Sequence, residues 1–271
     1  MPTGARLKGD TLKLEVYETS DLNYTIPQFS TIMPFIKKLC ENKWIFRSFL
    51  QSIFFNFYYL PFKQAIKLPV LLYKPKFISL KGRVIISTSH VKTGMIILGK
   101  PNVPIYPNKG IIFENNGGTI EFKGKCFIGN NSAISIGEKA KIEIGNKFVA
   151  STTLKLISCH HIVFGNGVRV GWECTFMDTD FHKMKKINGG YTKGYAPIRI
   201  GNNNWFGTKC HVMKRTETSD YCTISATTLL NQKYDYPPYT VIGGSPAKEI
   251  AHGVYRDVND DIIDFPDCRN L

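Results

Sequence analysis

The sequence predicts an all-β protein, a parallel β-helix built from hexapeptide coils, and three observations support this fold class. Between residues 128 and 207 of the 271-residue chain, a large apolar residue is followed directly by glycine seven times. The last four of these pairs begin at Phe164, Val170, Ile200 and Phe206, at intervals of six, thirty and six residues. An α-helix repeats its inward face every 3.6 residues and a strand every two, so a period of six indicates short straight segments separated by turns.

The third observation is that the phase of six continues through the intervening sequence. Apolar or small residues recur at this interval in two long runs: Ile144, Ala150, Leu156 and Ile162, and then Ile200, Phe206, Val212, Thr218, Ile224 and Leu230. Between runs the phase shifts by two, as at Ile142 and Ile144, which we interpret as coil corners with additional residues. A β-sandwich with glycine-rich turns is the alternative, but a sandwich has no reason to keep a six-residue phase.

The pattern divides the chain into four segments. These are an N-terminal amphipathic and basic segment (1–75), irregular early coils (76–126), the regular β-helix (127–245) and a short C-terminal tail (246–271). In the first segment, residues 35–39 and 44–50 have the composition of amphipathic helices. A solenoid needs capped ends, and this segment is a candidate for the N-terminal cap. The short tail is a candidate for a terminal helix.

The composition is typical of one compact protein, and the charge favours an acidic partner. The chain is 43% hydrophobic, its net charge is +14 and its pI is about 9.4, which favours an anionic partner. The seven cysteines include no Cys-x-x-Cys, and residues 1–30 lack the character of a secretory signal. We therefore expect free thiols and a cytoplasmic location.

The stretch from Lys37 to Arg83 permits two interpretations. It contains ten basic residues, one acidic residue (Glu41) and aromatic clusters such as residues 53–60. Basic residues beside aromatic ones can lie on an anionic membrane surface, which would make the protein peripheral at the inner membrane. Alternatively, the aromatic residues pack on the β-helix or on a neighbouring subunit and the lysines are solvated. No apolar run is long enough for a transmembrane helix.

The hexads stop after Phe176, and a loop (178–197) precedes their return at Ile198. A long loop leaving a rigid scaffold is a favoured place for function. This one holds His182, preceded by Asp178 and Asp180. Its other charged residues are all basic, namely Lys183, Lys185, Lys186 and Lys193. Such a loop suits an anionic ligand, for example a phosphate or a carboxylated sugar.

Three sequence elements resemble the hexapeptide-repeat acyltransferases. They are Asp-Thr-Asp-Phe-His at 178–182, Gly-Asn-Asn-Asn-Trp-Phe-Gly at 201–207 and Val-Ile-Gly-Gly-Ser-Pro-Ala-Lys at 241–248. The chain looks most similar to the branch that acetylates sugars in capsule, lipopolysaccharide and exopolysaccharide pathways. The resemblance covers about residues 110–252. It implies a left-handed β-helix, a homotrimer with active sites in the grooves between subunits, and acyl transfer from acetyl-CoA without a metal. It also implies that the partner is a carbohydrate and not a nucleic acid.

By the same resemblance His182 matches the catalytic histidine, and we expect it to act as general base. An imidazole suits this role because its ordinary pKa is near 6.5. Its other ring nitrogen needs an orienting acceptor, for which Asp178, Asp180 and a backbone carbonyl all remain open. The trio Cys159-His160-His161 has no partner pair at metal-site spacing, so we expect a structural placement for it.

The resemblance also carries the coenzyme contacts over by position. The expected contacts are Trp205, Thr208, Ala226, Thr227, Asn231 and Lys248. The sequence departs from the usual family pattern at Ile224-Ser225-Ala226-Thr227-Thr228, where many relatives have Ile-Gly-Ala-Gly-Ser. The coil is therefore bulkier here, which weakens these particular assignments.

Three functions compete at this point. The first is an O-acetyltransferase acting on a sugar of a surface polysaccharide or its precursor, with an anionic or lipid-linked acceptor left open. The second is an N-acetyltransferase acting on an amino-sugar nucleotide, but residues 1–75 lack the glycine-rich turn of the Rossmann-like domain that often accompanies that activity. The third is a non-catalytic β-helix that binds or scaffolds, which the intact motifs at 178–182 and 245–248 disfavour.

Overall fold

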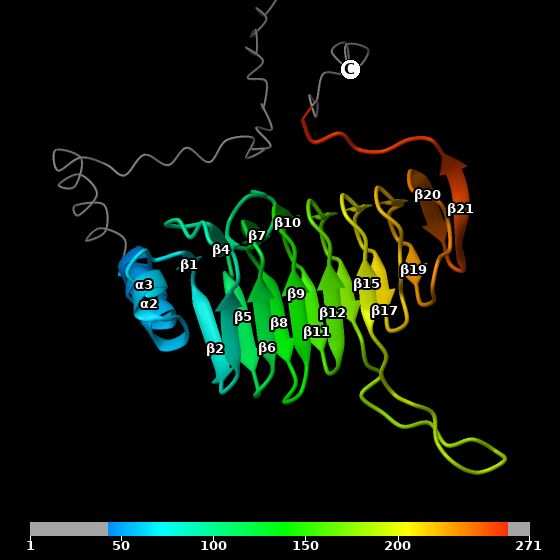
Figure 1. Cartoon of the computed structure of the whole chain (residues 1–271), viewed down its shortest axis with the longest axis horizontal. Helices are drawn as coiled ribbons and strands as arrows, with labels where there is room; N and C mark the ends of the chain where they lie inside the picture. Colours follow the sequence, from blue (N-terminus) through cyan, green and yellow to red (C-terminus); the bar gives the residue numbers. More distant parts are fainter. Residues whose placement is uncertain (1–42, 260–271) are drawn as a thin grey trace, which may run out of the picture.

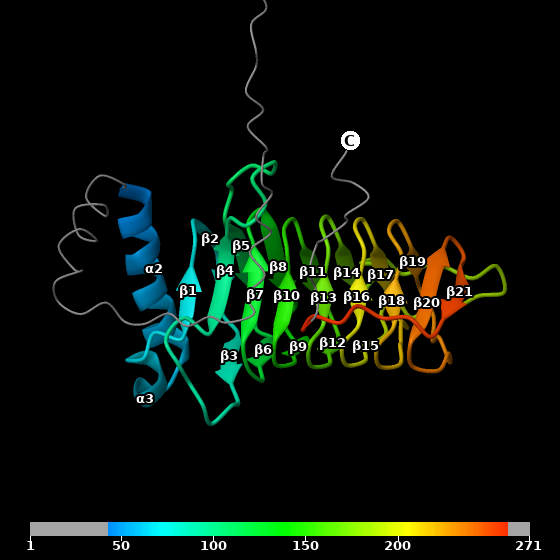
Figure 2. The same cartoon turned by 90° about the horizontal axis from the view of Figure 1, so that it is seen from above.

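The computed structural model describes residues 43–259. It shows a three-sided prism in which each face is a sheet of parallel strands (Figures 1 and 2). Face A contains β1 (Val70–Leu72), β4 (Ile96–Lys100), β7 (Cys126–Gly129), β10 (Phe148–Ala150), β13 (Arg169–Val170), β16 (Trp205–Phe206), β18 (Thr223–Ile224) and β20 (Thr240–Gly244), followed by the antiparallel β21 (Ala247–His252). Face B contains β2 (Pro75–Leu80), β5 (Ile111–Asn115), β8 (Ser132–Ile136), β11 (Lys155–Ser158), β14 (Thr175–Met177), β17 (His211–Met213) and β19 (Leu229–Leu230). Face C contains β3 (Arg83–Ile86), β6 (Thr119–Phe122), β9 (Lys141–Ile144), β12 (His161–Phe164) and β15 (Ile198–Ile200).

The chain visits faces A, B and C in turn, and each strand pairs in parallel with the strand one coil later. Between β16 and β18 Trp205 pairs with Thr223, and between β17 and β19 His211 pairs with Leu229; both are offsets of eighteen residues, or three hexads. The fold is the left-handed parallel β-helix that the motifs implied.

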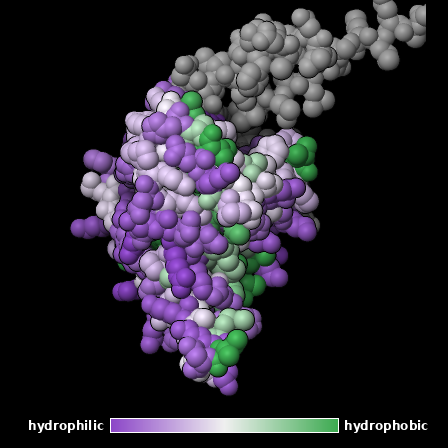
Figure 3. Space-filling model, turned by 90° about the vertical axis from the view of Figure 1, so that its right-hand side faces the viewer, coloured by the Kyte–Doolittle hydropathy of each residue, from purple (hydrophilic) through white to green (hydrophobic). Residues whose placement is uncertain are grey.

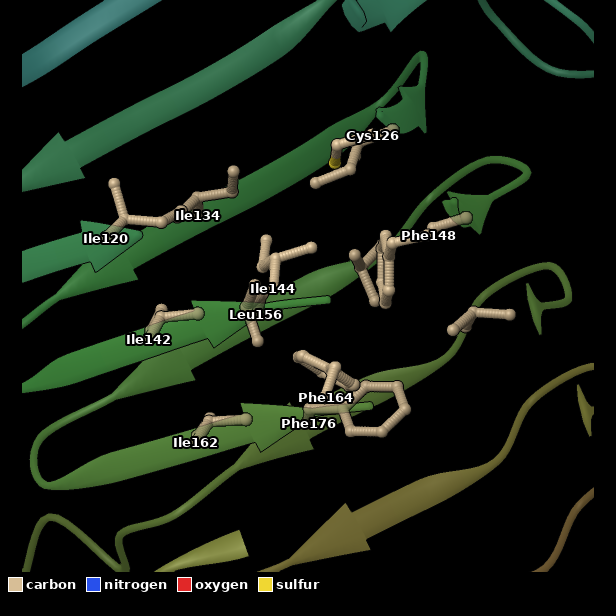
Figure 4. Close-up of a cluster of buried hydrophobic side chains, with 14 of the residues drawn as sticks. Ile120, Cys126, Ile134, Ile142, Ile144, Phe148, Leu156, Ile162, Phe164 and Phe176 are labelled. Atoms are coloured by element: carbon tan, nitrogen blue, oxygen red, sulfur yellow. The ribbon is translucent and has the colours of Figure 1, made fainter. Parts of the chain in front are cut away.

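Inward side chains from all three faces form one continuous core (Figure 4). The predicted inward residues Ile144, Leu156 and Ile162 are fully buried, and so is Ala150. Four phenylalanine rings follow one another along the axis in tilted or edge-to-face contact, with centroid separations of 4.9 Å, 5.0 Å and 5.1 Å between Phe148, Phe164, Phe176 and Phe206 in turn. Burying each such side chain stabilises the prism by about 1.5–3 kcal/mol.

The apolar–glycine pairs mark corners where successive coils touch. A Cβ on Gly145 would lie 2.2 Å from the carbonyl oxygen of Gly165, and one on Gly165 would lie 2.7 Å from the backbone nitrogen of Asn202. No side chain fits at such separations, so glycine is required by close backbone approach.

The register prediction was wrong at one position, Thr218. This residue is partly exposed, whereas Thr216 is fully buried and donates its hydroxyl to the carbonyl of Met213 at 2.7 Å. The reason is that this side of the coil has no regular strand. Its pairing with the neighbouring coils consists of isolated bridges from Glu217 to Arg199 and to Lys233, and the inward position falls two residues earlier.

Two helices, α2 (Lys43–Tyr59) and α3 (Phe62–Ala65), cover the N-terminal end of the prism (Figure 2). The expected helix at 44–50 is part of α2, while the one at 35–39 and a terminal helix beyond residue 259 lie outside the described residues. The prism already begins at β1, since Val70 pairs with Ile96. Within residues 43–259, no helix combines the length and apolarity needed to cross a bilayer.

Candidate active site

The loop at 178–197 projects from the corner between β14 and β15, and we call it the arm (Figure 1, lower right). Its two sides approach each other as an irregular antiparallel pair, with bridges from Thr179 to Tyr195 and from Lys185 to Tyr191. Gly189 and Gly190 turn the chain at the tip, where both have positive φ angles. The arm is thus a defined element of the fold, and it carries the residues singled out in the sequence.

Asp178 anchors the root of the arm and does not orient His182. Its side chain is fully buried and accepts three hydrogen bonds: from the hydroxyl of Ser158 at 2.6 Å and from the backbone N–H groups of Cys159 and His160 at 2.7 Å and 3.1 Å. These partners belong to the previous coil. They stabilise a buried carboxylate that would otherwise be costly.

The Asp180 carboxylate is also engaged away from His182. It forms an ion pair with the ammonium group of Lys214, whose side chain is only 17% exposed. The backbone N–H of Asp180 donates to the carbonyl of Gly194 at 2.7 Å. Asp180 therefore connects the two sides of the arm to each other and to the next coil.

His182 is exposed, and its ring is oriented by a backbone carbonyl. Nδ1 lies 3.1 Å from the carbonyl oxygen of Asp180. Since a carbonyl only accepts, Nδ1 carries a proton, and in the neutral imidazole Nε2 is then the nitrogen with the lone pair. A Cβ on Gly194 would lie 2.8 Å from the carbonyl oxygen of His182, so the opposite side of the arm packs closely behind this residue. Of the three acceptors left open by the sequence, the structure shows the backbone carbonyl.

The rest of the arm combines exposed cationic and exposed apolar side chains. The predicted acceptor-binding lysines, Lys183, Lys185, Lys186 and Lys193, are all exposed. Large apolar side chains are exposed among them, namely Phe181, Met184, Ile187, Tyr191 and Tyr195. Seen from the C-terminal end, the lower, tapering part of the molecule shows hydrophobic atoms beside hydrophilic ones (Figure 3). An exposed apolar group of this size is typical of a binding or assembly surface.

The expected coenzyme residues lie at several places in the fold. Thr208, Ala226 and Thr227 stack along the corner between faces A and B. Asn231 follows β19 at the corner that carries the arm. Trp205 lies on face A, and the Arg256 guanidinium covers its ring at 5.2 Å from the centroid. Lys248 is exposed on β21.

Within one chain, face B separates most of these residues from His182. The strand β17 begins just after Thr208 and ends just before Lys214, which contacts the arm. Ala226 and Thr227 are both exposed at their corner.

No family model matches the sequence, but curated relatives do. An uncharacterized 24.8 kDa protein in the cps region of Klebsiella pneumoniae is 32% identical over 112 residues, which is 41% of this chain and 49% of that protein. Galactoside O-acetyltransferase of Escherichia coli is 27% identical over 45% of this chain and 56% of its own length. Sophorolipid acetyltransferase of Starmerella bombicola is 34% identical over 41% and 42%. The chain thus spans about half the length of the curated relatives it matches.

Among solved structures, the polySia-specific acetyltransferase NeuO superposes with a TM-score of 0.50 over 72% of this chain and 77% of that one. At 14% sequence identity this similarity concerns the fold. The chain is therefore similar to curated sugar and sophorolipid acetyltransferases over part of its sequence, and to the polySia-specific acetyltransferase in its fold. Its repeats form the same kind of solenoid.

Two aromatic residues beside the expected coenzyme corner, Trp172 and Tyr106, were not singled out from the sequence. Trp172 is 38% exposed on the corner that carries Thr208, whose hydroxyl donates to the Trp172 carbonyl at 3.1 Å. Tyr106, from a distant loop, packs edge-to-face on Trp172 with centroids 5.8 Å apart. It donates a hydrogen bond to Glu173, which raises the pKa of the tyrosine hydroxyl to about 12. The available signal was that Trp172 follows Val170-Gly171 just as Thr208 follows Phe206-Gly207.

The Cys-His-His trio has a structural placement. The His160 ring packs against Tyr195 of the arm at 5.0 Å, and His161 Nε2 lies 2.9 Å from a carboxylate oxygen of Glu143. Hydrogen bonds from Lys123 first, then from Lys141 and His161, lower the pKa of Glu143 to about 2. In the part of the chain that the structure describes, no three His, Cys, Asp or Glu side chains are grouped as metal ligands.

Proposed function

We propose that the protein is an acetyl-CoA-dependent O-acetyltransferase that acts in the cytoplasm on a sugar hydroxyl of a surface polysaccharide or its precursor. The observation that carries this proposal is His182, exposed on the arm with Nδ1 held by a backbone carbonyl and Nε2 open. Relatives named as galactoside and sophorolipid acetyltransferases, and one from a cps region, support the choice of a sugar acceptor.

The proposed role of His182 follows from its tautomer. Nε2 accepts the proton of the sugar hydroxyl as that oxygen attacks the thioester carbonyl. The imidazolium is stabilised by the Nδ1–H bond to Asp180, and it returns the proton to the departing thiolate as the C–S bond breaks. The acyl group moves in one transfer, so no covalent enzyme intermediate is needed. A backbone N–H is the expected donor to the developing oxyanion.

A homotrimer would explain why one chain separates the two halves of the proposed site. The corner with Thr208, Ala226 and Thr227 is separated from His182 by face B. A neighbouring copy that placed this corner against the arm would bring a bound thioester to the imidazole. The exposed Ile187 and Tyr191 on the arm would be covered by such a contact.

An amine acceptor on a sugar nucleotide has less support. The described N-terminal part, from residue 43 to β1, contains two helices and no separate nucleotide-binding sheet. A purely structural role has less support too, because the His182 geometry would then have no use.

The proposal is tested by thiol release from acetyl-CoA in the presence of candidate glycan acceptors. His182→Ala should lower kcat by about 10²–10⁴-fold, the usual contribution of a general base. Coenzyme binding and assembly size should be retained. His90→Ala, which also removes an exposed histidine, is the matched control and should leave release unchanged. Unaltered release by His182→Ala would refute the assignment.

An anionic acceptor is the second part of the proposal, and it rests on the lysines of the arm. Replacing Lys185 and Lys186 with Ala should raise the KM for the acceptor several-fold and leave that for acetyl-CoA near the wild-type value. Added salt should weaken acceptor binding because exposed charges are screened. Lys139→Ala with Lys147→Ala is the matched control, since both lysines are exposed on the prism. A change in the coenzyme KM alone would instead assign the arm lysines to the coenzyme phosphates.

A further inference from the structure

The helix α2 differs from most surface helices because its buried face carries three polar side chains beside Phe55, whereas its exposed face is largely apolar. Ser48, Ser52 and Asn56 lie at intervals of four residues, and all three are at most 5% exposed. Residues at this spacing share one face of a helix. The usual arrangement places the apolar face on the core and the polar face in water.

The buried polar side chains of α2 form hydrogen bonds with the backbone at the edge of the prism. The side chain of Asn56 accepts from the N–H of Val70 at 3.1 Å and donates to its carbonyl at 2.7 Å. The N–H of Leu72 donates to the Ser52 hydroxyl at 2.9 Å, and that of Lys74 donates to Ser48 at 3.0 Å. The strand β1 is the first of face A, so these side chains replace the missing strand neighbour.

As a consequence, the apolar face of α2 points away from the prism. Phe46, Leu50, Phe54 and Phe57 are each about half exposed on this outer face, between 47% and 50%. The surface continues onto α3, since the Phe57 ring contacts Phe62 at 6.1 Å and Phe62 is 68% exposed. We call these side chains, together with Ile66, the cap surface.

The charges around the cap surface have one sign. Between Glu41 and Glu114 the chain contains eleven lysine and arginine residues and no aspartate or glutamate. Arg47 on α2 and Lys63 on α3 are exposed beside the apolar side chains, and Lys67 is exposed two residues after α3 ends. Aromatic side chains with adjacent cations are suited to the boundary between lipid headgroups and acyl chains.

We propose that the cap surface docks the protein on an anionic phospholipid bilayer. The charges favour a bilayer over a second copy of the chain as the partner of the cap surface. Two copies meeting through the cap surface would bring two basic rims together, and residues 43–113 contain no acidic side chain to offset the repulsion. A bilayer rich in anionic headgroups supplies the complementary charge and an apolar layer for the phenylalanines.

The arrangement of the helices suits this contact. The helix α2 runs across the end of the prism, close to perpendicular to its axis (Figures 1 and 2). A bilayer along its outer face would therefore hold the prism upright, with the arm toward the opposite end (Figure 1). The inference is independent of the enzymatic proposal, because a protein without acetyltransferase activity could still bind lipid in this way.

Co-sedimentation of the full-length chain with vesicles tests the proposal. Vesicles of phosphatidylglycerol and phosphatidylcholine should bind the protein, and vesicles of phosphatidylcholine alone should bind it far more weakly. A charge-reversed variant, Arg47→Glu, Lys63→Glu and Lys67→Glu, should lose about 100-fold or more in affinity, since each basic residue near such a surface contributes roughly a factor of five. The matched control reverses Lys125, Lys139 and Lys147, which are exposed on the prism, and should bind nearly as the wild type does.

An apolar variant separates lipid contact from simple charge attraction. Phe46→Gln, Leu50→Gln and Phe57→Gln should also weaken binding to anionic vesicles, whereas Ile105→Gln, at an exposed site on a loop, should not. Thermal unfolding of each variant shows whether the fold is retained. Absence of vesicle binding by the wild-type chain would overturn the proposal, as would equal binding by the charge-reversed variant. A smaller assembly for the apolar variant by sedimentation velocity, without an effect on vesicles, would assign the surface to a second copy instead.

Discussion

Phe176 and His182 are six residues apart in the chain and have opposite surroundings. The Phe176 ring is fully buried between Phe164 and Phe206 in the axis of the prism. His182 is exposed, and its ring has one hydrogen bond to a neighbouring carbonyl. In the coils, each inward residue is constrained by the coils above and below. In the arm, few contacts constrain the side chains, so they are available for chemistry, as in many loops on rigid scaffolds.

The largest expected effect is on the free energy of unfolding, which should respond very differently to substitution at these two positions. Phe176→Ala should lower the free energy of unfolding by about 3–5 kcal/mol, because it leaves a cavity in a packed core. His182→Ala should change it by less than about 0.5 kcal/mol, as is usual for exposed sites. Urea unfolding followed by circular dichroism measures both. Similar losses for the two variants would mean that the arm is packed into the folded core.

A substitution at Asp178, where the arm joins the coils, should have an intermediate effect on stability. Asp178→Ala removes the acceptor of three buried hydrogen bonds, and leaving such donors unsatisfied should cost about 2–3 kcal/mol. The lysines of the arm should then become more accessible to trypsin, because the root no longer holds the arm to the Ser158 corner. Asp235→Ala, at an exposed carboxylate, is the control and should be nearly neutral. Unchanged stability and cleavage in Asp178→Ala would show that other contacts anchor the arm.

The smallest effect is expected on the outer surface of face C. Glu143 accepts from Lys123 at 2.6 Å and Lys141 at 2.8 Å, and its pKa falls from 4.5 to about 2. A lowered pKa in the folded state stabilises the fold above pH 4.5, and this contribution is lost as the pH falls toward 2. Glu143→Gln should therefore cost about 1 kcal/mol at pH 7, a value reduced by the exposure of both lysines. The unfolding curves of the variant and the wild type should differ at pH 7 and coincide at pH 2.

Much of the fold could be predicted because the constraint is local and repeated. Each hexad places one apolar side chain inward and requires glycine where coils touch, so Ile144, Leu156 and Gly145 could be assigned by counting. Counting was wrong at Thr218, where the strand itself is lost and only the neighbouring coils reveal the inward residue. The position of His182 on an exposed loop also followed from the break in the hexads.

The roles of the polar residues could not be predicted in the same way. Asp178 accepts from groups eighteen to twenty residues earlier, a separation of about one coil that is known only once the coils are stacked. Tyr106 reaches Glu173 across 67 residues. The basic and aromatic character of residues 43–67 was visible in the sequence, but not which face of α2 is buried.

The sequence by itself determined the solenoid, its repeat and the place where the repeat is interrupted, because burial of one side chain in every six acts along the chain. Only the tertiary structure decided which hydrogen-bonding groups meet. It gave His182 a backbone carbonyl in place of Asp178, and it turned the serines of α2 inward. The physical reason is that apolar burial depends on periodicity alone, whereas a buried polar group requires a particular partner at a particular distance.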